Sequence, residues 1–147
     1  APGRGRGIAL QECFGSIVAE VVEVTVNEGD LSVDRVVAVI DAGYAVSPDG
    51  MRAQIESGII YGLSAALYGE ITIEDGAVAQ SNFHDYPSVR MSKAPAIETY
   101  IINSGEAMGG AGEPGTPPIA PALANAVFNA TGQRIRELPL QNSALNV

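Results

Sequence analysis

The stretch that decides the fold is Ile17–Ala42, IVAEVVEVTVNEGDLSVDRVVAVIDA. β-branched residues dominate both of its halves, which is typical of strands. In the first half, one face carries Val18, Val22, Val24 and Val26, and the other carries Glu23 and Thr25. The segment 27–30, NEGD, has the composition of a tight turn. We therefore predict strands at 17–26 and 31–42 that pair as an antiparallel hairpin.

A long helix is predicted directly after this hairpin. Ser47 can cap the free amide groups at a helix start, and Pro48 at the first helical position loses no hydrogen bond. The helix should run to about Tyr68, since apolar residues recur at every fourth position. This stripe consists of Met51, Ile55, Ile59, Leu63 and Leu67. Gly58 and Gly62 lie on an adjacent face, where they would let another backbone come close.

Shorter strands are predicted at 70–74, 97–102 and 134–138, and the tail after Pro139 should be extended. Residues 79–96 have little periodicity and form a long irregular connection. The segment 104–118, SGEAMGGAGEPGTPP, holds five glycines and three prolines. That composition excludes a regular element there.

A second, slim helix is predicted after this loop. Thr116 can cap it with Pro117 at its first position, and Gly132 closes it. Its apolar stripe consists of Ile119, Leu123 and Val127. Hairpins and only two principal helices favour an α+β fold, a two-layer sandwich with a mainly antiparallel sheet.

Composition limits the function. A chain of 147 residues with 46% hydrophobic residues is the size of one domain with its own core. The net charge of -9 would repel a phosphate backbone, so nucleic acid is not expected as a partner. One Cys and one His cannot form a zinc or iron–sulfur site, so we assign no metal ligands. No apolar run is long enough for a membrane span, and residues 1–7 lack the apolar stretch of a signal peptide.

The strongest candidate for chemistry is the segment 109–115, GGAGEPG, at the mouth of the second helix. Glycines can turn successive N–H groups toward one point, and the helix start adds free donors, so an anionic or oxo-bearing ligand could bind there. The alternative is that the segment is only a tight connection. Glu113 is the one carboxylate in this segment, held beside Pro114, and is either a positioned base or a solvated loop residue.

Other polar residues remain open to two interpretations. Asp41, Tyr44 and Gln54 are pocket groups, or else serve as caps and surface residues. His84 lies in the irregular connection, where we expect a packing or hydrogen-bonding role, because no triad pattern surrounds it. Cys13 has apolar neighbours, so we expect a buried thiol.

Three stretches of this chain together resemble a known family. They are VIDAGYAVSPDGMRAQIESGIIYGLSAALYGEITIEDGAV (39–78), NFHDYP (82–87) and GGAGEPGTPPIAPALANAVFNATGQRIRELPL (109–140). In order and spacing they are similar to the C-terminal end of the molybdenum-binding large subunit of the xanthine dehydrogenase/aldehyde oxidase family, closest to the branch of the isoquinoline 1-oxidoreductase β subunits. The resemblance also includes GRGRGIA (3–9). It implies that 1–147 is one C-terminal molybdopterin-binding domain, either a fragment or a piece of a split subunit.

The resemblance implies roles for particular residues. Glu113 stands in the place of the family's catalytic carboxylate, beside the molybdenum. Gln54 would contact the pterin or its nucleotide, although Ser57 replaces the first small glycine of that segment. The cofactor expected in this branch is molybdenum–molybdopterin cytosine dinucleotide. The cofactor-binding positions that the resemblance implies are Gln54, Gly110, Ala111 and Gly112.

The implied reaction is hydroxylation of an electron-poor carbon in a nitrogen heterocycle or an aldehyde, with water as the oxygen source. Glu113 would act as the base, the cofactor would do the redox work, and electrons would leave through a 2Fe-2S iron–sulfur subunit. The remainder of the molybdenum subunit is the other expected partner, in the cytoplasm or the periplasm. The chain alone should hold no cofactor tightly, catalyse nothing and self-associate. The alternative is a scaffold or interaction domain without turnover.

Overall fold

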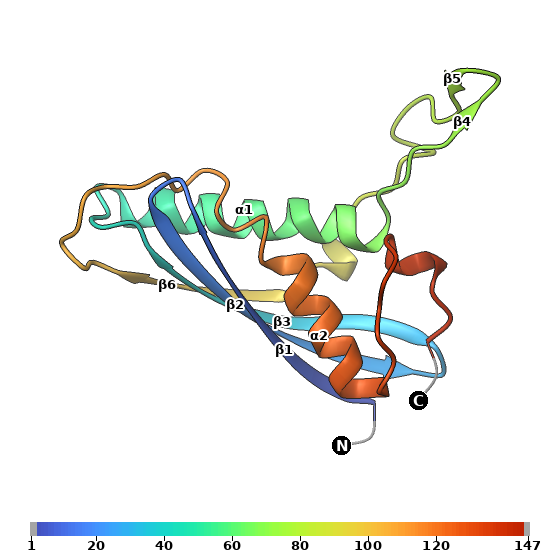
Figure 1. Ribbon diagram of the computed structural model, residues 1–147, viewed down its shortest axis with the longest axis horizontal. Coiled ribbons are helices and arrows are strands. Elements are labelled where there is room, and N and C mark those ends of the chain that lie inside the picture. Colours follow the sequence, from blue (N-terminus) through green and yellow to red (C-terminus); the bar gives the residue numbers. More distant parts are fainter. Residues whose placement is uncertain (1–2, 146–147) are drawn as a thin grey trace.

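A four-stranded sheet with two helices packed on one of its faces forms the body of the protein (Figure 1). The computed structural model describes residues 3–145. The strands are β1 (Arg4–Cys13), β2 (Ser16–Asn27), β3 (Asp30–Asp41) and β6 (Ala96–Ile102), in the order β1-β2-β3-β6. The first three are antiparallel neighbours, and β6 runs parallel to β3. This arrangement confirms the predicted α+β sandwich.

The central hairpin is the one that the sequence predicts. Val22 of β2 pairs with Val36 of β3, and the register shifts once, between Glu23 and Val24. Alternate residues of β2 are buried throughout the strand, as the apolar pattern indicates. The sequence analysis did not predict β1, because its GRGRG start lacks the β-branched residues that mark the other two strands.

Both predicted helices are present, and one of their starts differs. α1 (Pro48–Leu67) begins with Ser47 at its N-cap position and Pro48 in its first turn, as predicted, but the prediction that the Ser47 side chain caps the free amide groups is wrong. Ser47 instead accepts a hydrogen bond at its backbone carbonyl from the N–H of Met51, at 2.9 Å. α2 begins only at Ile119 and runs to Thr131, with Gly132 closing it in a left-handed conformation. The prediction that Thr116 caps α2 is wrong. Its hydroxyl instead donates to the carbonyl of Gly58 in α1, at 3.3 Å, and so links the loop to the first helix.

Glycines set the distances between these elements. A Cβ on Gly7 of β1 would overlap the backbone of Ala122 and Ala126 in α2, and one on Gly62 of α1 would overlap the side chain of Ile119. The predicted close approach at Gly62 is therefore confirmed. Gly7 explains why β1 tolerates a glycine-rich sequence: α2 lies directly on its backbone.

We expect Gly7→Ala to lower the free energy of unfolding by about 2–3 kcal/mol, because the new methyl group forces β1 and α2 apart. Urea denaturation of the 147-residue chain measures this change. Gly112→Ala is the matched control, since a Cβ at Gly112 meets nothing within 4 Å. Equal midpoints for the two variants would contradict the packing described here.

Side-chain amides of α2 cover the outer edge of β1. Asn125 donates its Nδ2 to the carbonyl of Ile8 at 3.1 Å, and the backbone N–H of Arg6 donates to Oδ1 of Asn129 at 3.0 Å. The two asparagines are four residues apart and therefore lie on one face of the helix. Two of the backbone groups that this edge strand would otherwise offer to another strand are thus paired within the chain.

The two faces of the sheet differ in what covers them. The inner face and the helices share one apolar core, which includes Val18, Val22, Ile40, Ile59 and Leu123. One ionisable residue, Glu20, lies within it at 0% exposure. In the described part of the chain no helix lies on the outer face, where large apolar side chains are exposed at Ile8, Leu10, Ile17, Tyr100 and Ile102.

A hairpin arm projects from the end of α1, away from the sheet (Figure 1). The strand predicted at 70–74 is reduced there to β4 (Ile73–Glu74), which pairs with β5 (Ala77–Val78). Short 3-10 turns follow at η1 (Met91–Lys93) and at η2 (Leu140–Asn142).

Three predictions near the chain ends are wrong. No strand forms at 134–138, because the Arg134 guanidinium instead stacks over the Phe128 ring, 3.5 Å from its centroid. The tail after Pro139 begins with the turn η2 rather than an extended run. Cys13 is only partly buried, since it ends β1 at an exposed turn. Residues 1–2 of the N-terminal segment and residues 146–147 of the tail lie outside the described residues.

Candidate functional site

The Gly/Pro-rich loop is fixed onto the β1–β2 turn and the end of β3 by three hydrogen bonds. The N–H of Gly110 donates to the carbonyl of Phe14 at 2.8 Å, and that of Gly109 donates to the carbonyl of Ala42 at 3.1 Å. Ser16, which is buried, donates its hydroxyl to the carbonyl of Gly110 at 2.6 Å. The loop therefore has a defined path three residues before Glu113.

Glycine is required where the loop crosses the turn. A Cβ on Gly109 would overlap the Ser16 hydroxyl and the Gly15 carbonyl. On the other side of Glu113, a Cβ on Gly115 would lie 2.8 Å from the carbonyl oxygen of Ile55 in α1. These close approaches explain why Gly109 and Gly115, at the two ends of the segment 109–115, are glycines.

Glu113 lies between these two anchored segments. The N–H of Thr116 donates to the Glu113 carbonyl at 2.8 Å, which closes a turn across Pro114 and Gly115. Pro114 and Gly115 are buried, whereas Glu113 is exposed. The backbone of Glu113 is thus held on both sides while its carboxylate stays accessible.

A hollow of about 400 Å³ opens beside this carboxylate. It lies between the β1–β2 turn, the middle of α1 and the loop before α2. Its lining is mainly apolar with one carboxylate, and it consists of Phe14, Ser57, Gly58, Tyr61, Gly112, Glu113, Thr116 and Pro117. Small-molecule sites commonly have this combination of an apolar lining and a few polar groups.

The predicted cofactor positions fall into three groups. The N–H of Gly110 is already bonded to Phe14, so this residue anchors the loop and cannot offer a free donor. Within residues 3–145, the amides of Ala111 and Gly112 have no hydrogen-bond partner, and both remain available to a ligand. Gln54 is exposed and does not line the hollow, but it is one helical turn before Ser57, which does.

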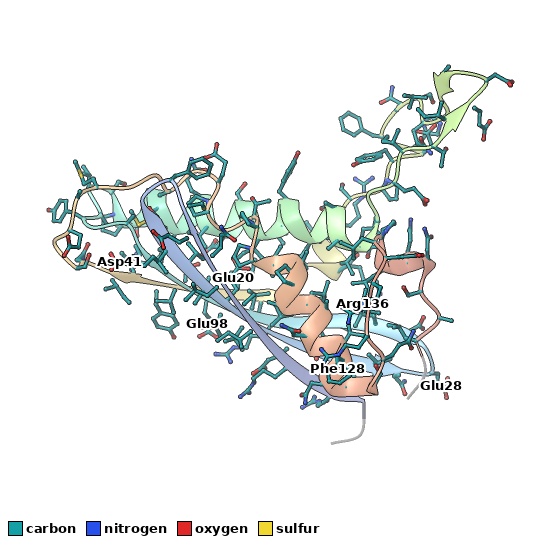
Figure 2. All side chains as sticks on the ribbon, viewed as in Figure 1. Glu20, Glu28, Asp41, Glu98, Phe128 and Arg136 are labelled. Atoms are coloured by element: carbon teal, nitrogen blue, oxygen red, sulfur yellow. The ribbon has the colours of Figure 1, made fainter. Side chains whose placement is uncertain are left out.

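The other polar candidates lie elsewhere. Asp41 accepts hydrogen bonds from the Gly43 amide and the Ser104 hydroxyl, which lower its pKa and give it the structural role of ordering a turn. Tyr44 is largely exposed and does not line the hollow. His84 is exposed on the hairpin arm, with its Nε2 3.6 Å from the Asp85 carboxylate. Figure 2 places Asp41 at the far end of the sheet from Glu28 and Phe128.

The sequence analysis did not predict two residues that line the hollow, Phe14 and Tyr61. For each of them, the sequence holds a feature that could have indicated the position. Tyr61 follows Gln54 by seven residues, so both lie on one face of α1. Phe14 precedes Gly15 between two strands, the position of a hairpin turn, but the first of those strands was not predicted.

Two kinds of feature are absent from the described residues. No group of three or more His, Cys, Asp or Glu side chains is placed to hold a metal ion in the range 3–145. No helix in this range has the length and apolar character needed to cross a membrane.

Comparison with known proteins gives one family match. The family model described as a molybdopterin cofactor-binding domain matches residues 6–95, more than half of the chain. The match includes most of β1, all of β2, β3 and α1, and it ends before the loop that carries Glu113.

Curated relatives and solved structures agree with this match. The β subunit of isoquinoline 1-oxidoreductase from Brevundimonas diminuta is 42% identical over 95% of this chain, and a nicotinate dehydrogenase subunit from Pseudomonas putida is 37% identical over 93%. The chain spans only 18% and 12% of their lengths. The crystal structure of the aldehyde oxidoreductase from Desulfovibrio desulfuricans is 26% identical with a TM-score of 0.66, covering 89% of this chain and 16% of that one.

Proposed function

From the premise that the chain belongs to the molybdopterin cofactor-binding domain family, we propose that it is the C-terminal part of a molybdenum hydroxylase subunit. The enzyme oxidises a nitrogen heterocycle or an aldehyde, and Glu113 is its catalytic base. The observation that carries this proposal is the position of Glu113. Its carboxylate is accessible in an apolar hollow, and its backbone is held on both sides by the loop anchors.

The residues present fit a bound molybdopterin cofactor. The free amides of Ala111 and Gly112 suit an anionic ligand, and a Cβ at Gly112 would meet only open space, so a ligand can approach the backbone there. Gln54 adds a side-chain amide one helical turn from the hollow. We propose the cytosine dinucleotide form of the cofactor. When bound, it supplies the two-electron redox chemistry of hydroxylation with water as the oxygen source.

Glu113 contributes proton transfer. A general base must first lie within reach of the proton that it accepts, and the anchored backbone of Glu113 supports this role. The carboxylate accepts the proton that is released as the water-derived oxygen is transferred to the substrate carbon. Phe14, Tyr61 and Pro117 line the hollow beside the carboxylate, so a ligand bound against them would displace water from around Glu113.

The proposed partners rest on coverage, because this chain spans only 18% and 12% of the lengths of the two relatives. We propose that the remainder of the molybdenum subunit encloses the cofactor, because one loop and one glutamine cannot surround a large anionic ligand. A 2Fe-2S subunit would take the electrons, in the cytoplasm or the periplasm. The names of the relatives, which refer to isoquinoline, nicotinate and aldehyde oxidation, support a heterocycle or aldehyde substrate.

The proposal is tested by expressing this chain within the complete subunit, together with the iron–sulfur subunit. We expect about one molybdenum per complex and reduction of an artificial electron acceptor with a heterocycle or an aldehyde. The 147-residue chain alone should contain no molybdenum. A complex that folds and assembles without molybdenum and without turnover would overturn the proposal and favour the scaffold alternative.

We expect Gln54→Ala to weaken cofactor retention in the complete enzyme, because one amide hydrogen bond to the pterin or its nucleotide is lost. The loss should be about 1–3 kcal/mol of cofactor binding. Molybdenum and pterin content of the purified enzyme, measured before and after gel filtration, checks this. Gln80→Ala, on the hairpin arm, is the control. Full occupancy with a changed ranking of substrates would instead place Gln54 in the substrate pocket.

A further inference from the structure

The turn between β1 and β2 contains an unusual residue for its conformation. Cys13 pairs with Ser16, so Phe14 and Gly15 form a two-residue hairpin loop, with φ angles of 55° and 74°. A turn with positive φ at both central residues favours Asn-Gly or Asp-Gly. A bulky aromatic residue with positive φ is strained.

The same chain contains turns of this kind with other residues. Glu28 and Gly29, at the opposite end of β2, have φ angles of 51° and 90°, and Asp75 and Gly76 on the arm have 50° and 80°. Their first residues are polar, as suits an exposed turn. Of the three turns, the one at Phe14 has an aromatic ring at its first central position. The hydrogen bond from the Gly110 N–H does not require this ring, because any residue could offer the backbone carbonyl that accepts it.

Burial within the described chain does not offset this strain. The Phe14 side chain is 65% exposed, so the ring gains little from packing. It lies instead in the wall of the hollow that contains Glu113. A second aromatic residue of that wall, Tyr61, is 73% exposed. Two accessible aromatic side chains beside one carboxylate make a surface that suits a flat ring, which aromatic groups bind by stacked or edge-to-face contact.

We propose that Phe14 is a ligand-contacting residue: its ring forms one wall of the Glu113 hollow and binds a planar ring system there. The inference deepens the proposed function and rests on it. A strained turn conformation is retained because the ring is needed in the hollow, and the stability lost in the turn is recovered in ligand binding. The planar ring is that of the heteroaromatic substrate or of the cofactor's pterin, which share this chemistry.

The test compares Phe14→Asn with Glu28→Asn, its matched control at the opposite turn of β2. In the 147-residue chain, each variant should raise Tm by about 2–4 °C, because asparagine accepts the turn conformation more readily. In the complete enzyme, Phe14→Asn should lower kcat/KM for a heteroaromatic substrate such as isoquinoline by ~10-fold and leave an aliphatic aldehyde within twofold. Phe14→Tyr should restore the parental ratio, and Glu28→Asn should not change it.

Molybdenum and pterin contents identify the ring that is bound. Unchanged contents with an altered substrate ratio support contact with the substrate. Lowered contents with an unchanged ratio support contact with the pterin. The proposal is overturned if an active Phe14→Asn enzyme keeps both its cofactor content and its substrate ratio, or if Tm falls in parallel with activity. An inactive parental enzyme would instead refute the proposed function, so the two failures are distinguishable.

Discussion

Glu113→Gln is expected to lower turnover of the complete enzyme by ~10²-fold or more while molybdenum content and fold stay near normal. The amide has nearly the same shape as the carboxylate but cannot accept a proton. The surrounding structure should tolerate it, because the side chain is exposed and only the Glu113 backbone carbonyl makes a structural hydrogen bond, to Thr116.

Steady-state rates with an artificial electron acceptor measure this effect. Glu106→Gln is the matched control, because Glu106 is an exposed glutamate of the same loop that does not line the hollow. It should retain parental turnover. Parental turnover in Glu113→Gln, with normal molybdenum content, would show that another group serves as the base.

A large effect of pH on stability is expected from Glu20. Burial raises the pKa of this carboxyl to about 8, and neither of its oxygens has a hydrogen-bond partner within residues 3–145. In the unfolded chain its pKa is near the ordinary 4.5. Between these values the folded state binds more protons, so stability is fully present below about pH 4.5 and falls as pH rises to about 8. The slope approaches that of one proton per molecule, and the loss of stability over the whole interval amounts to several kcal/mol.

Denaturation of the 147-residue chain in urea at pH 5, 6, 7 and 8 measures this dependence. Glu20→Gln should remove the slope and be more stable than the parent at pH 8, because a buried amide does not ionise. Glu28→Gln, exposed at the β2–β3 turn, should keep the parental slope. If the Glu20→Gln and parental curves ran parallel, the carboxyl would not be titrating in the core.

The elements with strong local signals were predictable. The β2–β3 hairpin follows from its alternating valines and its NEGD turn, and α1 follows from its proline start and its apolar stripe. Elements set by distant contacts were not. β1 begins with alternating glycines, which local propensity disfavours in a strand, and it is stable there because those glycines admit α2. The sequence at 134–138 alternates like a strand, yet it pairs with no strand of the sheet, and Arg134 packs instead on Phe128 of α2.

The candidate site shows the same division. The segment 109–115 was predicted as a candidate site from its four glycines and its single carboxylate, because so many glycines in seven residues permit an unusual backbone path. The anchoring of that segment by Ser16 and Phe14 depends on residues about 95 positions away, which no local pattern reveals. Thr116 was assigned to the wrong helix for the same reason. A threonine before two prolines resembles a cap, and only the tertiary packing shows that it bonds to Gly58.

The paired asparagines on α2 limit how copies of this chain can join. Growth of a fibril by strand addition needs an accepting edge at both ends of every sheet. Asn125 and Asn129 bond the Ile8 carbonyl and the Arg6 amide at the β1 edge, whereas no helix side chain bonds the β6 edge within the described residues. Two copies joined through β6 would each present a β1 edge that α2 partly covers, so we expect strand pairing to favour a dimer over a longer array. We therefore expect larger assemblies of the isolated chain to form through the apolar outer face, so that detergent disperses them and they give no cross-β diffraction pattern.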